Sequence, residues 1–226
     1  MDTKQINSFE EYLKELEVFP EIDFFRGQSS IDYRLLPSIG RMLKDGNTDA
    51  LLTFEQEIFL DFKRKYSRYT SCRPQNDMEF LFLAQHYGLP TRLLDWTYNP
   101  LIALYFACST NFDKDGVVFH MMPFSRKIFD ANCHDILKFP YETVFQPNLT
   151  DVRYENQNGL FVYYPKPWEE NTDHIWHKYI ISHGIKQDIL NKLIKIGINR
   201  AFIMPSLDNL CKDIIYIHKL RHPSLA

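Results

Sequence analysis

The first candidate for chemistry is the motif Phe25-Arg26-Gly27-Gln28, at the end of an apolar run that predicts a buried strand. An arginine in that position can hold a phosphate or carboxylate with two parallel hydrogen bonds. A glycine beside it lets a ligand approach the backbone closely. The alternative is a structural arginine paired with a buried carboxylate, and this motif by itself favours that alternative.

The second candidate is the polar run from Gln85 to Pro100, which lies between two segments that are apolar on every side. Stranding a polar group in a core costs about 2–7 kcal/mol, so these groups must be paired or line a cavity. Arg92 and Asp95 could neutralise each other, and His86 could be a core histidine at a helix end. A ligand-binding cleft explains the whole cluster better, with these members: Arg26, His86, Thr91, Arg92 and Asp95.

Two further segments carry weaker signals. Polar residues lead into an expected strand near 158–164, so Glu155 or Gln157 could face the same cleft, although an exposed strand edge explains them equally well. A basic stretch at 63–73 contains interleaved tyrosines and could contact a nucleic acid backbone. Such a run is more often the solvated face of a helix, and the net charge of -3 also makes nucleic acid a poor candidate partner.

Composition limits the class of protein to which this chain can belong. The chain has 226 residues, of which 45% are hydrophobic and 24% charged, as expected for one globular domain. No apolar run approaches the roughly 18–20 residues that cross a bilayer, and the N-terminus lacks the pattern of a secretory signal. We therefore expect a cytoplasmic protein that makes no membrane contact. The four cysteines are widely spaced and predict free thiols, and His174 and His177 lack companion ligands, so no metal is expected.

Hydrophobic periodicity and turn residues predict an α+β fold, with a mixed or antiparallel sheet core and buried helices. We expect helices over 8–17 with Ser8 as the N-cap, 50–68, 77–87, 100–109 with Asn99 as the N-cap, 184–198, and from Ser206 onward. Strands are expected at 22–27, 91–96, 116–122, 158–164, 174–182 and 201–204, with an ordered loop at 29–41.

The order of these motifs resembles the FRG domain family. Phe25-Arg26-Gly27 matches the tripeptide that names the family, and the stretches 33–41 and 86–107 follow in the expected order. Gln157, Gly159 and Phe161 also fit, as does the run 205–208. The resemblance implies a single FRG domain over residues 1–226.

A more distant resemblance, to ADP-ribosyltransferases of the toxin type, implies a mechanism. In that family an aromatic-Arg-Gly element, a Ser/Thr-bearing strand followed by an Ala-rich aromatic helix, and a glutamate on a third strand form the site. The three elements would be 25–27, then 91–97 with the helix at 103–107, and then Glu155 or Gln157. The chain departs from the pattern because it lacks the Ser-Thr-Ser triplet, and Gln157 in the third position would weaken the case for transfer.

The resemblance implies NAD as a co-substrate, with the pyrophosphate on arginine and a carboxylate near the oxocarbenium-like ribose. The candidate catalytic residues are Arg26, His86, Glu155 and Gln157. The candidate nucleotide-binding residues are Arg26, Gly27, Gln28, Thr91, Arg92, Asp95, Thr97 and Asn99. The alternatives are a non-catalytic module that binds a ligand or protein in the same cleft, and nucleic-acid binding through residues 63–73.

Overall fold

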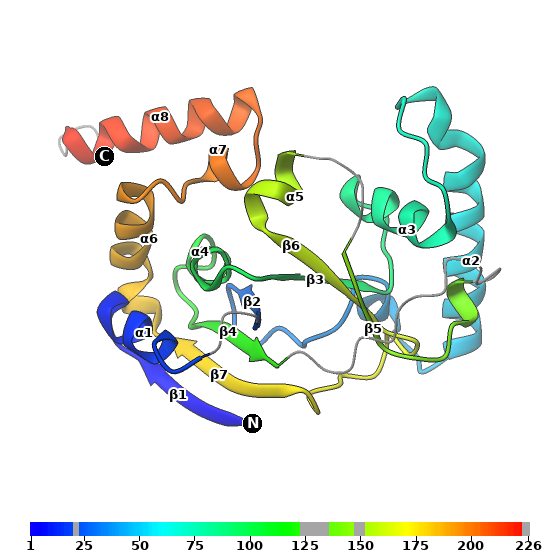
Figure 1. Ribbon diagram of the computed structural model, residues 1–226, viewed down its shortest axis with the longest axis horizontal. Coiled ribbons are helices and arrows are strands. Elements are labelled where there is room, and N and C mark those ends of the chain that lie inside the picture. Colours follow the sequence, from blue (N-terminus) through cyan, green and yellow to red (C-terminus); the bar gives the residue numbers. More distant parts are fainter. Residues whose placement is uncertain (20–22, 123–135, 147–151, 223–226) are drawn as a thin grey trace.

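The computed structural model describes residues 1–19, 23–122, 136–146 and 152–222. They form a single seven-stranded sheet with helices packed against it, which confirms the predicted α+β class (Figure 1). The strands are β1 (Asp2–Ile6), β2 (Phe24–Gln28), β3 (Leu93–Thr97), β4 (Gly116–Met121), β5 (Thr143–Phe145), β6 (Gly159–Tyr163) and β7 (Ile175–Ile181). Their order across the sheet is β1-β7-β4-β2-β3-β6-β5. β1 and β7 are parallel, and the other neighbouring pairs are antiparallel.

Most of the helices begin close to where local signals predict, and the short helices at 152–157 and 200–203 were not predicted. They are α1 (Phe9–Leu16), α2 (Thr48–Lys65), α3 (Asp77–His86), α4 (Pro100–Cys108), α5 (Val152–Gln157), α6 (Lys186–Lys195), α7 (Arg200–Ile203) and α8 (Leu207–Arg221). Ser8, Asn99 and Ser206 are N-caps whose side chains accept hydrogen bonds from backbone N–H groups of α1, α4 and α8. Gly88, with φ +90, follows the end of α3.

Two groups of helices cover the same face of the sheet. Side chains alternate along a strand, so Leu93, Asp95 and Thr97 share one face of β3. Leu93 packs in a cluster with α2 and α3, whereas Thr97 lies opposite Phe25, which packs with α1, α4 and α6. The α2–α3 group therefore lies on one half of this face and the α4–α6 group on the other half.

The centre of the sheet is weakly paired. β2 pairs with β4 at five positions but with β3 only at Phe25 and Thr97. Beyond that pair, β2 and β3 share no further ladder positions, whereas Asp95 and its neighbours pair with β6 on the other side. The separation lies between the two helix groups and gives room for a cavity in the middle of the molecule.

Gly27 is needed for the packing of α4 on β2. A Cβ at this position would lie 1.8 Å from the main-chain oxygen of Ala103 and 2.8 Å from the nitrogen of Ala107. Because both contacts are to helix backbone, a side chain at position 27 could not be accommodated by a rotamer change. Gly27 therefore allows α4 to pack closely against β2, whereas the sequence suggested that it lets a ligand approach the backbone.

Several elements differ from the predictions. The segment expected as a strand at 201–204 is helical, because Asn199 caps α7 and Asp213 accepts a hydrogen bond from the nitrogen of Ala201 at 2.7 Å. β1 and β5 were not predicted, since the first is polar and mostly exposed and the second has three residues. The polar approach to β6 is α5, which is followed by Asn158 at φ 46.

Candidate functional site

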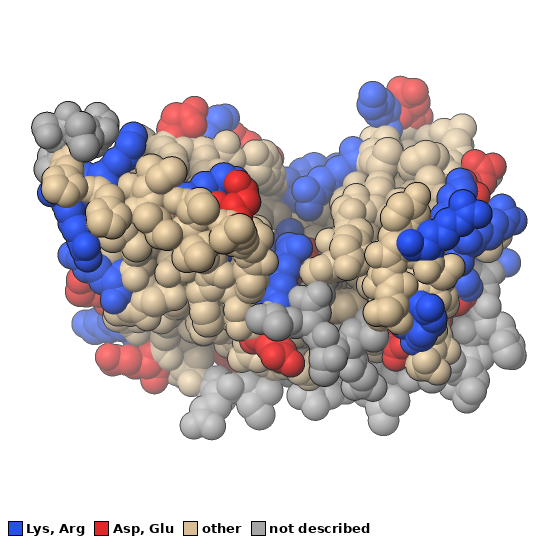
Figure 2. Space-filling model, turned by 90° about the horizontal axis from the view of Figure 1, so that it is seen from above, with Lys and Arg blue, Asp and Glu red and all other residues tan. Residues whose placement is uncertain are grey.

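A cavity of about 180 Å³ lies where β2 and β3 separate. Its lining residues come from β2, β3, α4 and α5. Figure 2 shows the molecular surface hollowed between its two halves, with Lys and Arg side chains inside the hollow. The cavity is lined by Phe25, Arg26, Gly27, Asp95, Trp96, Thr97, Ile102, Phe106, Arg153 and Gln157.

Arg26 bridges the two strands where their own pairing ends. Its Nη1 donates to the main-chain oxygen of Asp95 at 2.5 Å and lies 3.8 Å from Oδ2 of the same residue. The Arg26 side chain is 14% exposed, while that of Asp95 is 58% exposed. The Nε of Arg26 is buried and has no hydrogen-bond partner among the described residues. The pair is therefore open at its carboxylate end, and the guanidinium retains unused donor capacity.

Asp95 connects the first cavity to a second one of about 190 Å³. This adjoining space is lined by Ser38, Arg41, Gln85, Gly88, Leu89, Leu93, Leu94 and Asp95. The amide of Gln85 donates to Asp95 Oδ1 at 2.8 Å, which holds the carboxylate between the two spaces. One carboxylate thus faces both cavities.

Several charged side chains line the two adjoining cavities. Among the described residues, three arginines line them, Arg26, Arg41 and Arg153, together with the carboxylate of Asp95. Burial lowers the pKa of Arg26 below its usual value, and the positive charge of Arg41 lowers it further, whereas Asp95 opposes the shift. An arginine under these conditions remains protonated, and an anion entering the cavity would relieve the repulsion between the guanidinium groups.

The sequence candidates for catalysis occupy different places. Gln157 lines the first cavity, where its side chain donates to the main-chain oxygen of Ile203 at 2.9 Å. Glu155 is exposed on α5 and is not part of the cavity lining. His86 lies half-buried at the end of α3 against the ring of Tyr87, outside both cavities. Arg26 and Gln157 are therefore together, whereas Glu155 and His86 are not with them.

Arg92 is part of the core. It is 1% exposed and forms an ion pair with Glu55, with Nε donating to Oε1 at 2.8 Å and Nη2 bonded to Oε2. Its Nη1 also donates to the main-chain oxygens of Leu137 and Pro165 and to the hydroxyl of Tyr163. Burial alone would lower the pKa of Arg92, but the bonds to Glu55 raise the pKa above its usual value. Arg92 does not pair with Asp95, and its donors are directed into the protein.

The other predicted nucleotide-binding residues make hydrogen bonds within the fold. Thr91 is fully buried and bonds Gln85 and Ser38. The Thr97 hydroxyl donates to the main-chain oxygen of Gln157 at 2.6 Å and lines the cavity. Asn99 caps α4. The amide nitrogen of Gln28 lies 3.5 Å from the main-chain oxygen of Arg34, and its Oε1 has no hydrogen-bond partner among the described residues.

Arg41, Arg153 and Gln85 were not singled out from the sequence as site residues. Arg41 follows a proline-containing loop and Arg153 lies on a short polar helix, so neither has a local pattern that predicts a site. Gln85 begins the polar run of the sequence and lies in the last turn of α3, but it has no ionisable group. These side chains come from the end of the loop 29–41, from α3 and from α5, and they reach the two adjoining cavities only in the folded chain.

Three basic residues of the stretch 63–73 are paired with carboxylates. Lys63 pairs with Asp77 at 2.5 Å, and Lys65 and Arg64 pair with Asp61 at 2.7 and 3.5 Å. Tyr69 is nevertheless 86% exposed. The charge of Lys63, Arg64 and Lys65 is therefore partly compensated by two carboxylates, and nucleic-acid binding through this stretch stays a prediction.

His177 contacts the buried His120 across 3.1 Å between their Nδ1 atoms, and within the described ranges no three His, Cys, Asp or Glu side chains gather in a metal-binding arrangement. Cys72, Cys108 and Cys211 are free, and Cys133 lies outside the described residues. In the part of the chain that the structure describes, no helix has the length and hydropathy needed to span a membrane.

Comparison with known proteins identifies one family. No curated protein and no solved structure matches the chain. The family model described as the FRG domain matches residues 22–116. The matched range includes Arg26, Arg41, Gln85 and Asp95, but ends before Arg153 and Gln157. The chain therefore carries an FRG domain, and most of the cavity around Arg26 is built from it.

Proposed function

We propose that the cavity around Arg26 binds a phosphate group of a nucleotide, and that the nucleotide is NAD used as the co-substrate of an ADP-ribosyltransferase-like reaction. One observation carries the proposal. A guanidinium with an unused, buried Nε lies at the separation of two central strands, and a second arginine lines the same cavity. Arginine pairs of this kind suit phosphate oxygens, which accept several charge-assisted hydrogen bonds at once.

The size of the cavities agrees with an extended ligand. The first holds about 180 Å³, which is less than the roughly 300 Å³ at the lower end of small-molecule sites. It has room for one phosphate, ribose or nicotinamide group but not for a dinucleotide. The adjoining cavity of about 190 Å³ begins at Asp95, so a longer ligand would pass this carboxylate and reach Arg41.

The transfer chemistry needs a carboxylate near the ribose. When the bond between ribose C1′ and the nicotinamide nitrogen breaks, nicotinamide leaves with the bonding electrons and the sugar becomes cationic before a nucleophile, such as water, attacks C1′. Asp95 is the carboxylate that lines both cavities, and Glu155 lies outside them. In this proposal Asp95 stabilises the cationic sugar, and the side chain of Gln157 lines the cavity beside the ligand.

A non-catalytic binding module is the second candidate. It is favoured by the position of Glu155, because the residue expected to supply the catalytic carboxylate is exposed and away from the arginines. It is also favoured by the ion contact of Asp95 with Arg26, because Asp95 is the carboxylate among the described residues that line the cavity. Both candidates require nucleotide binding, and they differ only in nicotinamide release.

The test is calorimetric titration of NAD, with nicotinamide release followed in parallel by chromatography. The wild-type protein should bind NAD in the micromolar to millimolar range typical of enzyme substrates, and Arg26→Ala should abolish binding. Arg26→Lys keeps the charge but loses the planar fork, and should bind more weakly than wild type. Arg68→Ala is the matched control, because this exposed arginine lies outside both cavities.

The outcomes separate the candidates. Binding that Arg26→Ala removes, with release that Asp95→Asn removes, supports the transferase. Binding with no release supports the non-catalytic module. Absence of binding at about millimolar NAD, in protein shown to be folded by circular dichroism, contradicts both.

A further inference from the structure

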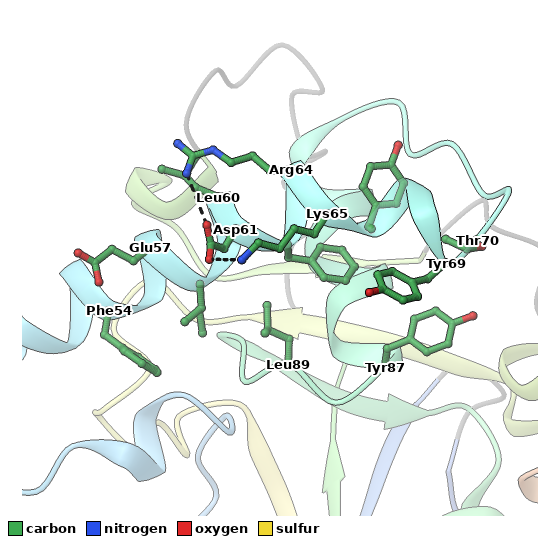
Figure 3. Close-up of a pocket in the computed structure, with 13 residues that line it drawn as sticks. Phe54, Glu57, Leu60, Asp61, Arg64, Lys65, Tyr69, Thr70, Tyr87 and Leu89 are labelled. Atoms are coloured by element: carbon green, nitrogen blue, oxygen red, sulfur yellow. Dashed lines mark hydrogen bonds and ion pairs between the residues drawn. The ribbon is translucent and has the colours of Figure 1, made fainter.

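A cavity of about 960 Å³ lies beside α2, away from Arg26. Figure 3 shows it between α2 with the short turn that follows and the end of α3. Its volume is at the upper end of the range for small-molecule sites, about 300–1,000 Å³. The lining residues are Phe54, Glu57, Ile58, Leu60, Asp61, Phe62, Arg64, Lys65, Tyr66, Tyr69, Thr70, Tyr87 and Leu89.

Aromatic and aliphatic side chains around this cavity are exposed although they are large. Tyr69 is 86% exposed and Tyr87 is 65% exposed, while Phe54 and Leu60 are 38% and 40% exposed. In Figure 3 Tyr69 and Tyr87 lie beside each other at one end of the cavity, and Phe54 lies at the other end. Scattered apolar residues on a surface are normal, but a contiguous group around one hollow marks a binding site.

The cavity wall is held in place by the fold. The ring of Tyr66 stacks on Phe62 at 6.0 Å and meets Phe80 edge-on at 5.1 Å. Tyr87 and Leu89 flank Gly88, which follows the end of α3 with a φ of +90. The backbone N–H of Gly88 donates to the main-chain oxygen of Gln85. The two sides of the cavity therefore come from a packed helix and from a fixed helix cap, so the cavity is largely preformed.

The charges of the cavity compensate one another. Glu57 and Asp61 are balanced by Arg64 and Lys65, and Asp61 bonds both basic side chains (Figure 3). No excess charge is left among these four residues to attract an anion or a cation. The tyrosine hydroxyls are then the polar groups that could orient a ligand.

We infer that this cavity is a binding site for an uncharged ligand with a planar aromatic ring system. Its ring would stack between Tyr69 and Tyr87, and its apolar edges would contact Phe54, Leu60 and Leu89. Flat rings gain from offset or edge contacts with tyrosine beyond their buried area, whereas a phosphate-bearing ligand would find no unpaired cation among the described residues that line the cavity. The inference is independent of nucleotide binding at Arg26.

The test uses N-phenylnaphthylamine, a neutral aromatic dye that fluoresces when it leaves water. Wild-type protein should give a saturable signal for one site. Tyr69→Ser combined with Tyr87→Ser should weaken binding at least about tenfold, because two stacking rings are lost. Leu60→Trp, which fills the cavity and leaves its chemistry apolar, should also weaken binding by a similar factor.

Two controls make the test specific. Ile215→Ser changes an apolar residue of α8 that is 58% exposed elsewhere, and it should leave dye affinity unchanged. The sulfonated analogue, anilinonaphthalene sulfonate, carries a negative charge and should bind more weakly than the neutral dye. Arg26→Ala should bind the dye as wild type does, whatever its effect on NAD.

The inference is overturned if the dye does not bind, if the double tyrosine variant and Leu60→Trp both keep wild-type affinity, or if Ile215→Ser weakens binding as much as they do. Stronger binding of the sulfonated dye would also overturn it, because the site would then select anions. Circular dichroism of each variant confirms that the substituted protein is folded, and the substituted residues are not core residues.

Discussion

The ion pair of Glu55 and Arg92 provides the sharpest prediction about stability. Both side chains are almost completely buried, with exposures of 2% and 1%. Glu55→Gln keeps the shape of the side chain but removes the negative charge that faces the guanidinium. Removing one partner of a buried pair costs about 3–5 kcal/mol, because the other charge is left uncompensated. For a chain of this size, that loss should lower the melting temperature by about 6–20 °C.

The double variant Glu55→Met with Arg92→Met tests the cause. It removes both charges and leaves three oxygens without their arginine donor, those of Leu137, Pro165 and the Tyr163 hydroxyl. At about 1 kcal/mol for each lost hydrogen bond, the double variant should lose about 3 kcal/mol. That loss is smaller than the summed losses of the single variants Glu55→Met and Arg92→Met. The double-mutant cycle should therefore show a coupling of at least about 2 kcal/mol.

The assay is urea unfolding followed by tryptophan fluorescence. Glu57→Gln is the matched control, since Glu57 lies on the same helix but is exposed, and it should change the free energy of unfolding by less than about 0.5 kcal/mol. NAD affinity of Glu55→Gln, measured well below its melting temperature, should equal that of wild type. A loss below about 1 kcal/mol, or an additive double variant, would refute the structural role of the pair.

Three further predictions concern packing, pH and thiol reactivity. Gly27→Ala should lower the melting temperature by about 6–12 °C, because overpacking against the backbone of α4 costs about 3 kcal/mol, and a change under about 2 °C would contradict this packing. Burial lowers the pKa of His120, so the folded state favours the neutral imidazole; stability should be fully present above about pH 6.5 and decline below it, with a shallower decline in His120→Gln during acid titration. Burial raises the pKa of Cys108 to about 12; peptide mapping after iodoacetamide treatment near pH 8 should find the exposed Cys211 modified and Cys108 untouched unless the protein is first unfolded.

The three residues of the family-naming tripeptide have separate roles in this fold. Phe25 stacks on His120 with ring centroids 4.9 Å apart and an interplanar angle of 12°. Arg26 bridges β2 and β3 at the cavity. Gly27 admits the backbone of α4. Two of the three residues therefore act in packing, and Arg26 is the residue whose chemistry remains available to a ligand.

Local signals were enough to predict most of the helices. Ser8, Asn99 and Ser206 are caps that act within a few residues of the helix they begin, so their effect is visible in the sequence. The segment from Arg200 to Ile203 was misread, because four apolar-rich residues resemble a strand and its helical form depends on a hydrogen bond from the distant Asp213. β1 was not predicted for a similar reason, since its parallel pairing with β7 joins two segments that lie far apart in the sequence.

The candidate site could be predicted only in part. Arg26, Asp95 and Gln157 are gathered at one cavity, but the roles assigned to them stay predictions. Arg92 was expected to bind the nucleotide because a core arginine and a ligand-binding arginine look alike in sequence. Its partner Glu55 lies on α2, which no short motif connects to the polar run. The contributions of Arg41 and Arg153 depend on loops and helices that come together only in the folded chain.

The central claim, that Arg26 receives the phosphate of a nucleotide, can be observed at a single atom. The Nε–H of Arg26 has no hydrogen-bond partner among the described residues, so its nitrogen–proton NMR signal, assigned by its loss in Arg26→Lys, reports directly on the cavity. A saturable shift of this signal on addition of NAD, with the Arg68 signal unmoved, is the predicted result. An Arg26 signal that stays in place while NAD is added to saturation would contradict the claim.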